Sequence, residues 1–310
     1  MATWGFAVIR LTGLLAAVGL VTSRAGLLAH ELVGHGGAAL LAGGKILEVR
    51  LFYVAGGWIR YRLAEPTVAG YAFVEVAGIA VEAVLGLALL LLLIRRDGLA
   101  ARIARGVGAA LVVHAGWYFA TGTWHGYGDF VRIHRELGAA RVPIALAVGL
   151  ASCAVAFLGA RIVLGSIAAA VPGARGRRIA GVATACLLAG GLQIALALGE
   201  VRVRRDDTYG TIMQPERERV IARELAAWQR QQPHVDEAAR AARARELAAQ
   251  HRVLPFAPIL AVLLAAAVLL GARRARPAPA GPIATRFVAL AAALAGGSIA
   301  LVIALDAAFH

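Results

Sequence analysis

Charged residues are scarce in this sequence, and so are cysteines. Only 16% of the 310 residues are charged while 60% are hydrophobic, and the mean hydropathy is +0.73. Soluble domains are about half apolar and a quarter charged, so the composition excludes an ordinary soluble globule as well as a disordered chain. Two cysteines, both inside apolar runs, exclude a disulfide scaffold. Apolar runs of about 20 residues recur, which predicts a multi-pass membrane protein.

Acidic residues are few as well, 18 against 32 lysines and arginines, which gives a formal net charge of +14. Almost all the basic residues are arginines in short segments between apolar runs, where they are expected to anchor helices at anionic headgroups. No basic stripe interleaved with aromatic residues is present, so the predicted partner is the lipid bilayer and not nucleic acid. The N-terminus lacks the features of a signal peptide, so the first span is expected to be retained.

The apolar runs predict an all-α polytopic membrane protein with about eight transmembrane helices. The predicted spans cover residues 5–21, 27–43, 68–94, 105–128, 143–171, 179–198, 254–270 and 283–305. A tight turn at 22–26 is expected between the first two spans, because Arg24 in the middle of a bilayer would be costly. The alternative is one long helix in which the Arg24 side chain reaches toward the membrane surface.

Two segments do not have the pattern of spans. Residues 45–63 are rich in β-branched and aromatic side chains around Gly56 and Gly57, which predicts a short β-hairpin lying on or dipping into the membrane interface. Residues 200–252 are charged and alanine-rich, which predicts two amphipathic, solvent-facing helices broken at Pro233. The predicted organisation is a membrane core at 1–142, two further spans at 143–199, the insert at 200–252 and a C-terminal helix pair at 253–310.

The second predicted span contains the sequence HELVGH, with His30, Glu31 and His35 in an otherwise apolar run. In zinc hydrolases with an H-E-x-x-H motif, the two imidazoles bind the metal and the glutamate accepts a proton from water. Histidines at i and i+4 lie about 40° apart on an α-helix, but the i and i+5 spacing found here gives about 140°. A π-type turn would return both histidines to one face, and Gly34 provides the backbone freedom for it. The alternative is that both are buried polar residues bonded to neighbouring helices.

This motif, the hairpin after it and the following span resemble the site-2 protease family of intramembrane zinc metalloproteases over about residues 20–135. The text AHELVGHGGAALLAGGKI matches the family's helix apart from one inserted residue. The text AGIAVE at 77–82 aligns with the family's Ala-Gly-Pro-x-x-Asn element, with Ile79 at the proline and Glu82 at the asparagine. The lengthened H-E-x-x-G-H form is also similar to the zinc-binding motif of the soluble dipeptidyl peptidase III family.

The resemblance implies a zinc ion, Zn2+, held by two histidines and an aspartate, here His30, His35 and Asp129 in the text HGYGDF. It implies that Glu31 is the general base and that the substrate is a membrane-spanning protein segment. The hairpin around Gly56 and Gly57 would then present its edge to that segment by strand addition.

Other residues compete for roles at this site. Glu82 and His114 are alternative third ligands, because both are expected near the depth of the histidines. His125 lies four residues before Asp129 and is expected to be its hydrogen-bonding partner. Glu75 is interpreted as a buried carboxylate bonded to a neighbouring span.

Two functions remain open on the sequence. The first is an intramembrane zinc metallopeptidase of a bacterial cell membrane, with the hairpin side in the cytoplasm as the family resemblance implies. The second is a non-proteolytic membrane protein that binds or transports metal, or a relative of the proteases that no longer cuts. The inserted residue, Ile79 in place of proline and Glu82 in place of asparagine favour the second. Arginines are evenly divided between the two sides, so charge does not decide the orientation.

Overall fold

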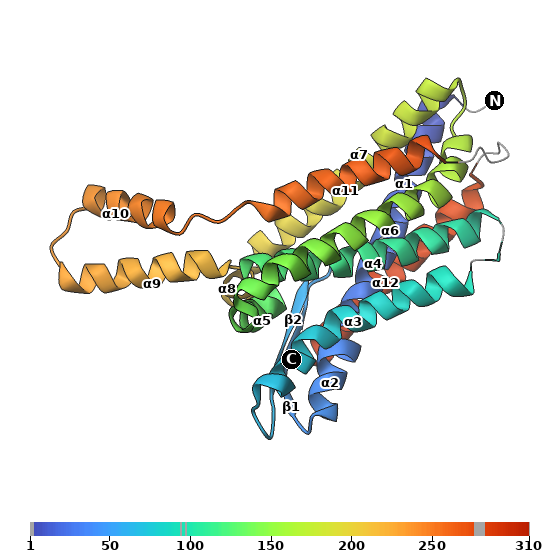
Figure 1. Cartoon of the computed structure of the whole chain (residues 1–310). Coiled ribbons are helices and arrows are strands. Elements are labelled where there is room, and N and C mark those ends of the chain that lie inside the picture. The colour runs from blue at the N-terminus through green and yellow to red at the C-terminus, as the bar shows by residue number, and fades with distance from the viewer. Residues whose placement is uncertain (1–2, 94, 97, 276–282, 310) are drawn as a thin grey trace.

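The computed structural model describes residues 3–93, 95–96, 98–275 and 283–309, and it shows a bundle of long helices with one small β-hairpin (Figure 1). The elements are α1 Trp4–Leu28, the π-helix η1 Ala29–Gly36, α2 Gly37–Leu41, β1 Lys45–Leu51, β2 Gly57–Arg62, α3 Val68–Leu92, α4 Leu99–His125, the 3-10 turn η2 Gly128–Phe130, α5 Val131–Leu137, η3 Gly138–Ala140, α6 Arg141–Ala169, α7 Arg175–Arg204, α8 Asp207–Ile212, α9 Glu216–Gln231, α10 Glu237–Gln250, α11 Phe256–Arg273 and α12 Thr285–Ala308. Seven helical segments among the described residues are long and apolar enough to cross a membrane, as expected for a multi-pass membrane protein.

The first two predicted spans form one continuous helical segment. α1 runs without a break through η1 into α2, so Trp4–Leu41 is a single candidate span of 38 residues. The predicted turn at 22–26 is therefore wrong, and the described residues contain seven candidate spans where about eight were expected. Consistent with an odd number, α1 begins and α12 ends at opposite ends of the bundle (Figure 1).

Arg24 is tolerated inside this helix because the β-hairpin supplies partners for it. The side chain is only 1% exposed, and its guanidinium donates hydrogen bonds to the carbonyl oxygens of Phe52, Val54 and Ala55 at 2.6, 3.1 and 2.5 Å. Charge-assisted hydrogen bonds of this kind offset the cost of removing the cation from water. The alternative prediction of one long helix is therefore confirmed, but Arg24 bonds to the hairpin loop and does not reach toward the membrane surface.

The hairpin predicted within residues 45–63 is present. β1 and β2 pair antiparallel, with Lys45 opposite Arg62 and Leu51 opposite Gly57. The hairpin runs back along the first helix, so its loop reaches Arg24, which precedes Leu41 by 17 residues or about 26 Å of helix. The loop thus lies among the helices, where its backbone groups need partners inside the protein.

Two acidic side chains complete the set of partners for the hairpin backbone. Glu200 on α7 accepts hydrogen bonds at 2.6, 2.7 and 3.0 Å from the N–H groups of Tyr53, Val54 and Ala55. Asp306 on α12 accepts a hydrogen bond from the Leu51 N–H at 2.8 Å and pairs with Arg204 at 3.2 Å. The hairpin is therefore fixed by charged groups from α1, α7 and α12, which satisfies its loop without water.

The long helices pack in two groups, one around α1 and the other around α4. α7 and α12 pack along α1, where Leu11 and Leu14 are fully buried against residues that include Ala185 and Ala295. α6 and α11 pack along α4, and at this contact Trp124 stacks on Phe256 with ring centroids 4.4 Å apart. α3 packs against both η1 and α4, which places it directly beside the two histidines.

The insert predicted at 200–252 contains the two expected helices, α9 and α10, which are separated around Pro233 and extend away from the bundle (Figure 1). α7 continues to Arg204, and the short helix α8 precedes α9. Glu216 at the start of α9 pairs with Arg135 of α5 at 2.8 Å and with Arg223 at 3.0 Å. Burial raises the pKa of Glu216, but the two arginines outweigh it and hold this pKa below its ordinary value. The contact is therefore strongest above the ordinary carboxyl range and weakens as the pH falls through the lowered pKa.

Some predicted features lie outside the described residues or are not tested by the fold. Residue 94, the expected end of the third span, and residues 276–282, which lie between the last two predicted spans, are outside the described residues. The division of the chain into four segments stays a prediction.

We expect Arg24→Ala to lower the free energy of unfolding by about 3–5 kcal/mol, because three buried carbonyl groups would lose their charged donor. Unfolding in detergent micelles, followed by circular dichroism against temperature and denaturant, measures this. Arg202→Ala is the matched control, since Arg202 is exposed on α7, and it should change stability by less than about 0.5 kcal/mol. Equal stability of the two variants would contradict the role of Arg24.

Candidate metal centre

The two histidines of the HELVGH motif lie on one face of a π-helix. Residues Ala29–Gly36 are wound with i to i+5 geometry, which turns the lengthened spacing into a same-face pair. The Nε2 atoms of His30 and His35 are 3.1 Å apart, and the two rings meet edge to face with centroids 4.7 Å apart. The predicted π-type winding is confirmed.

Glycines let the π-helix lie close to its neighbours. A Cβ at Gly34 would lie 2.5 Å from the Cα of Gly78 on α3, so only a glycine permits this approach of the two backbones. A Cβ at Gly36 would lie 3.4 Å from the Ile59 side chain of β2. η1 is therefore packed between α3 and the hairpin, and the histidines are held at the contact with α3.

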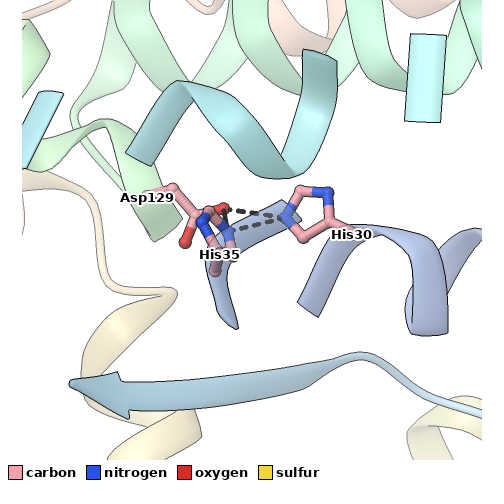
Figure 2. Close-up of side chains that lie close together, drawn as sticks. All are labelled: His30, His35 and Asp129. Atoms are coloured by element: carbon pink, nitrogen blue, oxygen red, sulfur yellow. Dashed lines mark hydrogen bonds and ion pairs between the residues drawn. The ribbon is translucent and has the colours of Figure 1, made fainter. Parts of the chain in front are cut away.

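Asp129 reaches the histidines because α4 ends just before it. His125 is the last residue of α4, and Gly126 and Gly128 both have positive φ, at 68° and 60°. These left-handed positions favour glycine and turn the chain into η2, which carries Asp129. The Asp129 Oδ2 atom lies 3.1 Å from Nε2 of His30 and 3.2 Å from Nε2 of His35 (Figure 2).

The three side chains fit a metal ion. Their nearest atoms form a triangle with edges of 3.1, 3.1 and 3.2 Å. Ligands at about 2.0–2.2 Å in a tetrahedron around zinc lie about 3.3–3.6 Å from one another, so small adjustments suffice. His30, His35 and Asp129 together form a group able to hold a metal ion. Both histidines are buried while the Asp129 side chain is 25% exposed, so the group is open on one side.

Gly78 provides the space in front of the ligand atoms. A Cβ at this position would lie 2.6 Å from Nε2 of His35 and 2.8 Å from Nε2 of His30. Any side chain there would enter the volume that an ion needs. The glycine of the text AGIAVE therefore has a direct geometric role beside the two imidazoles.

The second ring nitrogen of each histidine faces an oxygen atom on α3. His35 donates a hydrogen bond from Nδ1 to the carbonyl oxygen of Val74 at 2.7 Å, which leaves Nε2 unprotonated for a metal. Nδ1 of His30 lies 3.6 Å from Oε2 of Glu82. This Glu82 oxygen is buried and has no hydrogen-bond partner, while the other accepts a 2.8 Å hydrogen bond from Nδ1 of His114.

The alternative ligands thus lie behind His30 and outside the triangle. Glu82 faces the ring nitrogen that points away from Asp129, and His114 contacts Glu82. The geometry favours Asp129 as the third ligand and gives Glu82 and His114 the position of supporting residues. His125 does not take its predicted place: in the described chain the Asp129 carboxylate contacts His30 and His35, and the Asp129 N–H donates a hydrogen bond to the Tyr118 hydroxyl at 3.3 Å.

Glu31 follows the first histidine and is buried, at 6% exposure. It lines a cavity of about 1170 Å³ together with His30, Glu82 and His114. The predicted general base therefore borders the same hollow as the first ligand.

Gly56 and Gly57 also line this cavity, at the tip of the hairpin. The loop backbone before them is already bonded to Arg24 and Glu200, and the Gly56 carbonyl accepts a hydrogen bond from the Phe52 N–H. The tip is therefore not free to add a strand. Within the described chain β2 pairs only with β1, so strand addition would need the outer edge of Gly57–Arg62.

Glu75 is bonded to a neighbouring element, as its interpretation predicted. Its Oε1 accepts a hydrogen bond from Arg132 at 3.3 Å, and Arg132 stacks over the ring of Tyr71 at 3.9 Å. Sequence reasoning missed Arg132 as its partner and Tyr118 as the partner of Asp129. Arg132 lies about one helical turn after Asp129, and this spacing was the signal in the sequence that could have placed Arg132 near the site.

We expect the purified protein to bind about one zinc per chain and His35→Ala to lose it, because two ligands hold the ion far less tightly than three. Metal content by mass spectrometry after dialysis against a weak chelator measures this. His251→Ala is the control, since His251 lies in the insert and pairs with Glu224. Equal zinc in the two variants would contradict the assigned ligands.

Gly78→Ala should lower zinc occupancy at least tenfold while the helix bundle stays folded, because the methyl group would occupy the position of the ion. Gly190→Ala on α7 is the matched control, since a Cβ there meets nothing within 4 Å. Zinc titration of both variants, with circular dichroism to confirm helix content, tests this. Unchanged zinc affinity in Gly78→Ala would show that the ion does not sit against α3.

Comparison with known proteins adds no relative. No protein family, no curated protein and no solved structure matches this chain. The resemblance to site-2 proteases therefore rests on the motif residues themselves, and the firm conclusion is a multi-pass helical protein with a His-His-Asp group able to hold a metal ion.

Proposed function

We propose that the protein is an intramembrane zinc metallopeptidase that hydrolyses peptide bonds of membrane-spanning substrates. The observation that carries this proposal is the approach of Asp129 to His30 and His35 of the π-helix within an apolar bundle, with Glu31 adjacent to His30 in sequence and buried. Two imidazoles and one carboxylate form the three-ligand set typical of catalytic zinc sites, which keep a fourth position for water or substrate.

Zinc is the metal that the donor set favours. Imidazole nitrogen with a single carboxylate oxygen suits a borderline metal, whereas calcium and magnesium prefer sites made of oxygen atoms. The hydrogen bond from His35 to Val74 and the contact of His30 with Glu82 fix the orientation of the two rings, as is usual for zinc-bound histidines.

The metal ligands and Glu31 have different roles in the proposed hydrolysis. Zinc bound to the three ligands would polarise the scissile carbonyl and acidify a water molecule. Glu31 accepts the proton of the attacking water and then donates it to the leaving amine, as a general base followed by a general acid. Its burial beside the apolar cavity strengthens these electrostatic interactions, because the local dielectric is low.

The position of the site supports a substrate within the membrane. The ligands come from the first candidate span and from the turn after α4, and they are covered by α3. Soluble peptides would have to cross apolar helices to reach them, whereas a membrane-spanning segment is already at that depth. The outer edge of β2 offers unpaired backbone groups to an unwound segment, a recurring mode of peptide recognition.

Glu31→Gln should lower peptide-bond cleavage by about 10²–10⁴-fold without loss of zinc, because the ligands remain while the proton acceptor is removed. The measurement is the appearance of new N-termini within apolar segments of the membrane proteome after reconstitution, with zinc content assayed in parallel. Glu65→Gln is the matched control, since Glu65 is exposed before α3.

The outcomes separate the candidate functions. Persistent cleavage by Glu31→Gln would refute the role of Glu31. Zinc binding by the wild type without any new N-termini would overturn the protease and leave the metal-binding alternative.

A further inference from the structure

Tyr118 on α4 lies beside two of the three candidate ligands. Its hydroxyl oxygen is 3.3 Å from the backbone nitrogen of Asp129, and its ring centroid is 5.9 Å from the ring centroid of His30. Tyr118 also lines the cavity that borders Glu31. The phenol is therefore next to the candidate metal centre and on the same hollow as the predicted general base.

The hydroxyl hydrogen of Tyr118 has no acceptor among the described residues. The Asp129 N–H donates to the Tyr118 oxygen, so the hydroxyl is the acceptor in this contact and its own hydrogen is left over. The neighbouring phenol differs, because the Tyr127 hydroxyl shares a 2.5 Å hydrogen bond with the Thr121 hydroxyl. A partly buried O–H donor without an acceptor is unfavourable unless water or a ligand accepts from it. Tyr118 thus offers a donor to a molecule that enters the site.

The packing around Tyr118 fixes the position of this donor. The ring meets Phe130 edge to face, with centroids 5.3 Å apart, and stacks on His114 at 6.3 Å. A Cβ at Gly128 would overlap the Tyr118 oxygen, so the turn before Asp129 can pass the hydroxyl only because this residue is glycine. A donor that is already held in place needs little reorganisation when charge develops next to it.

We propose that Tyr118 is a further catalytic residue, which donates a hydrogen bond to the oxyanion of the tetrahedral intermediate. The inference rests on the proposed function and adds a residue to it. In the attack, a C–O bond forms to the water oxygen, the π electron pair of the carbonyl moves to the carbonyl oxygen, and a water proton goes to Glu31. The Tyr118 hydrogen stays on its own oxygen. When the intermediate collapses, the C=O bond re-forms, the C–N bond breaks and Glu31 gives the proton to the amine.

This hydrogen bond stabilises the intermediate more than the substrate. A substrate carbonyl is neutral, whereas the oxyanion carries a full charge, and hydrogen bonds to charged groups are stronger. The apolar surroundings strengthen the difference, because the local dielectric is low. Removal of the hydroxyl should therefore weaken the binding of an anionic tetrahedral group and leave the binding of an uncharged peptide unchanged.

The test measures binding as well as cleavage, with the full zinc-loaded chain in detergent micelles. The probe is an apolar peptide of leucine and alanine in which a phosphinate, an anionic tetrahedral group, replaces one amide. The matched probe carries an uncharged ketomethylene group at the same place. Tyr118→Phe should lower the affinity for the phosphinate peptide about 10–10²-fold and change the affinity for the ketomethylene peptide by less than about twofold. The rate at which new N-termini appear in reconstituted membranes should fall about 10²-fold.

Tyr127→Phe is the matched control, since Tyr127 lines the same cavity but its hydroxyl is bonded to Thr121. It should bind both peptides like the wild type. Zinc content and helix content of Tyr118→Phe should equal those of the wild type. Loss of zinc, or an equal loss of affinity for both peptides, would show that Tyr118 only supports Asp129 and would overturn the proposal. Unchanged cleavage by Tyr118→Phe would also overturn it and leave the proposed function intact, whereas a wild type that cuts nothing would overturn both.

Discussion

The geometry of the candidate metal centre depends on how one helix is wound. With two residues between the glutamate and the second histidine, an α-helix suffices to pair the imidazoles, but this chain has three residues there. The π-helical segment Ala29–Gly36 takes up the extra residue, so His30 and His35 share a face. Gly34 allows α3 to lie directly against this segment, and Gly78 keeps the space before the ligand atoms open. The winding, the close packing and the metal pocket are thus one structural arrangement.

A second constraint is that every polar group inside an apolar bundle needs a partner from the protein. Arg24 and Glu200 bond the carbonyl and N–H groups of the hairpin loop, so irregular backbone lies stably among helices. Asp306 and Arg204 do the same for the end of β1. These contacts hold the hairpin beside the π-helix, and the charged side chains that make them are bonded to the hairpin backbone. The position of the hairpin beside the site is therefore fixed by hydrogen bonds.

The sequence predicted features that arise from local patterns. Hydropathy predicted the helical membrane class, and the β-branched pattern with paired glycines predicted the hairpin. The i, i+5 spacing predicted the π-winding, because two imidazoles and one ion allow few other geometries. The continuous first helix was predicted only as the alternative, since the partners of Arg24 lie about thirty residues away and only the folded hairpin presents them. The pairing of Glu82 with His114 and the cavity beside Glu31 also depend on packing between distant helices, which local patterns do not encode.

The central claim is that one zinc ion contacts both imidazoles of the π-helix and the carboxylate of Asp129. X-ray absorption spectroscopy at the zinc edge of the purified, zinc-loaded protein tests it most directly. The account predicts two imidazole nitrogens and oxygen ligands at about 2.0–2.2 Å, with one imidazole lost from the spectrum of His30→Ala. A spectrum with a single imidazole or with sulfur ligands, or one identical in His30→Ala, would contradict it.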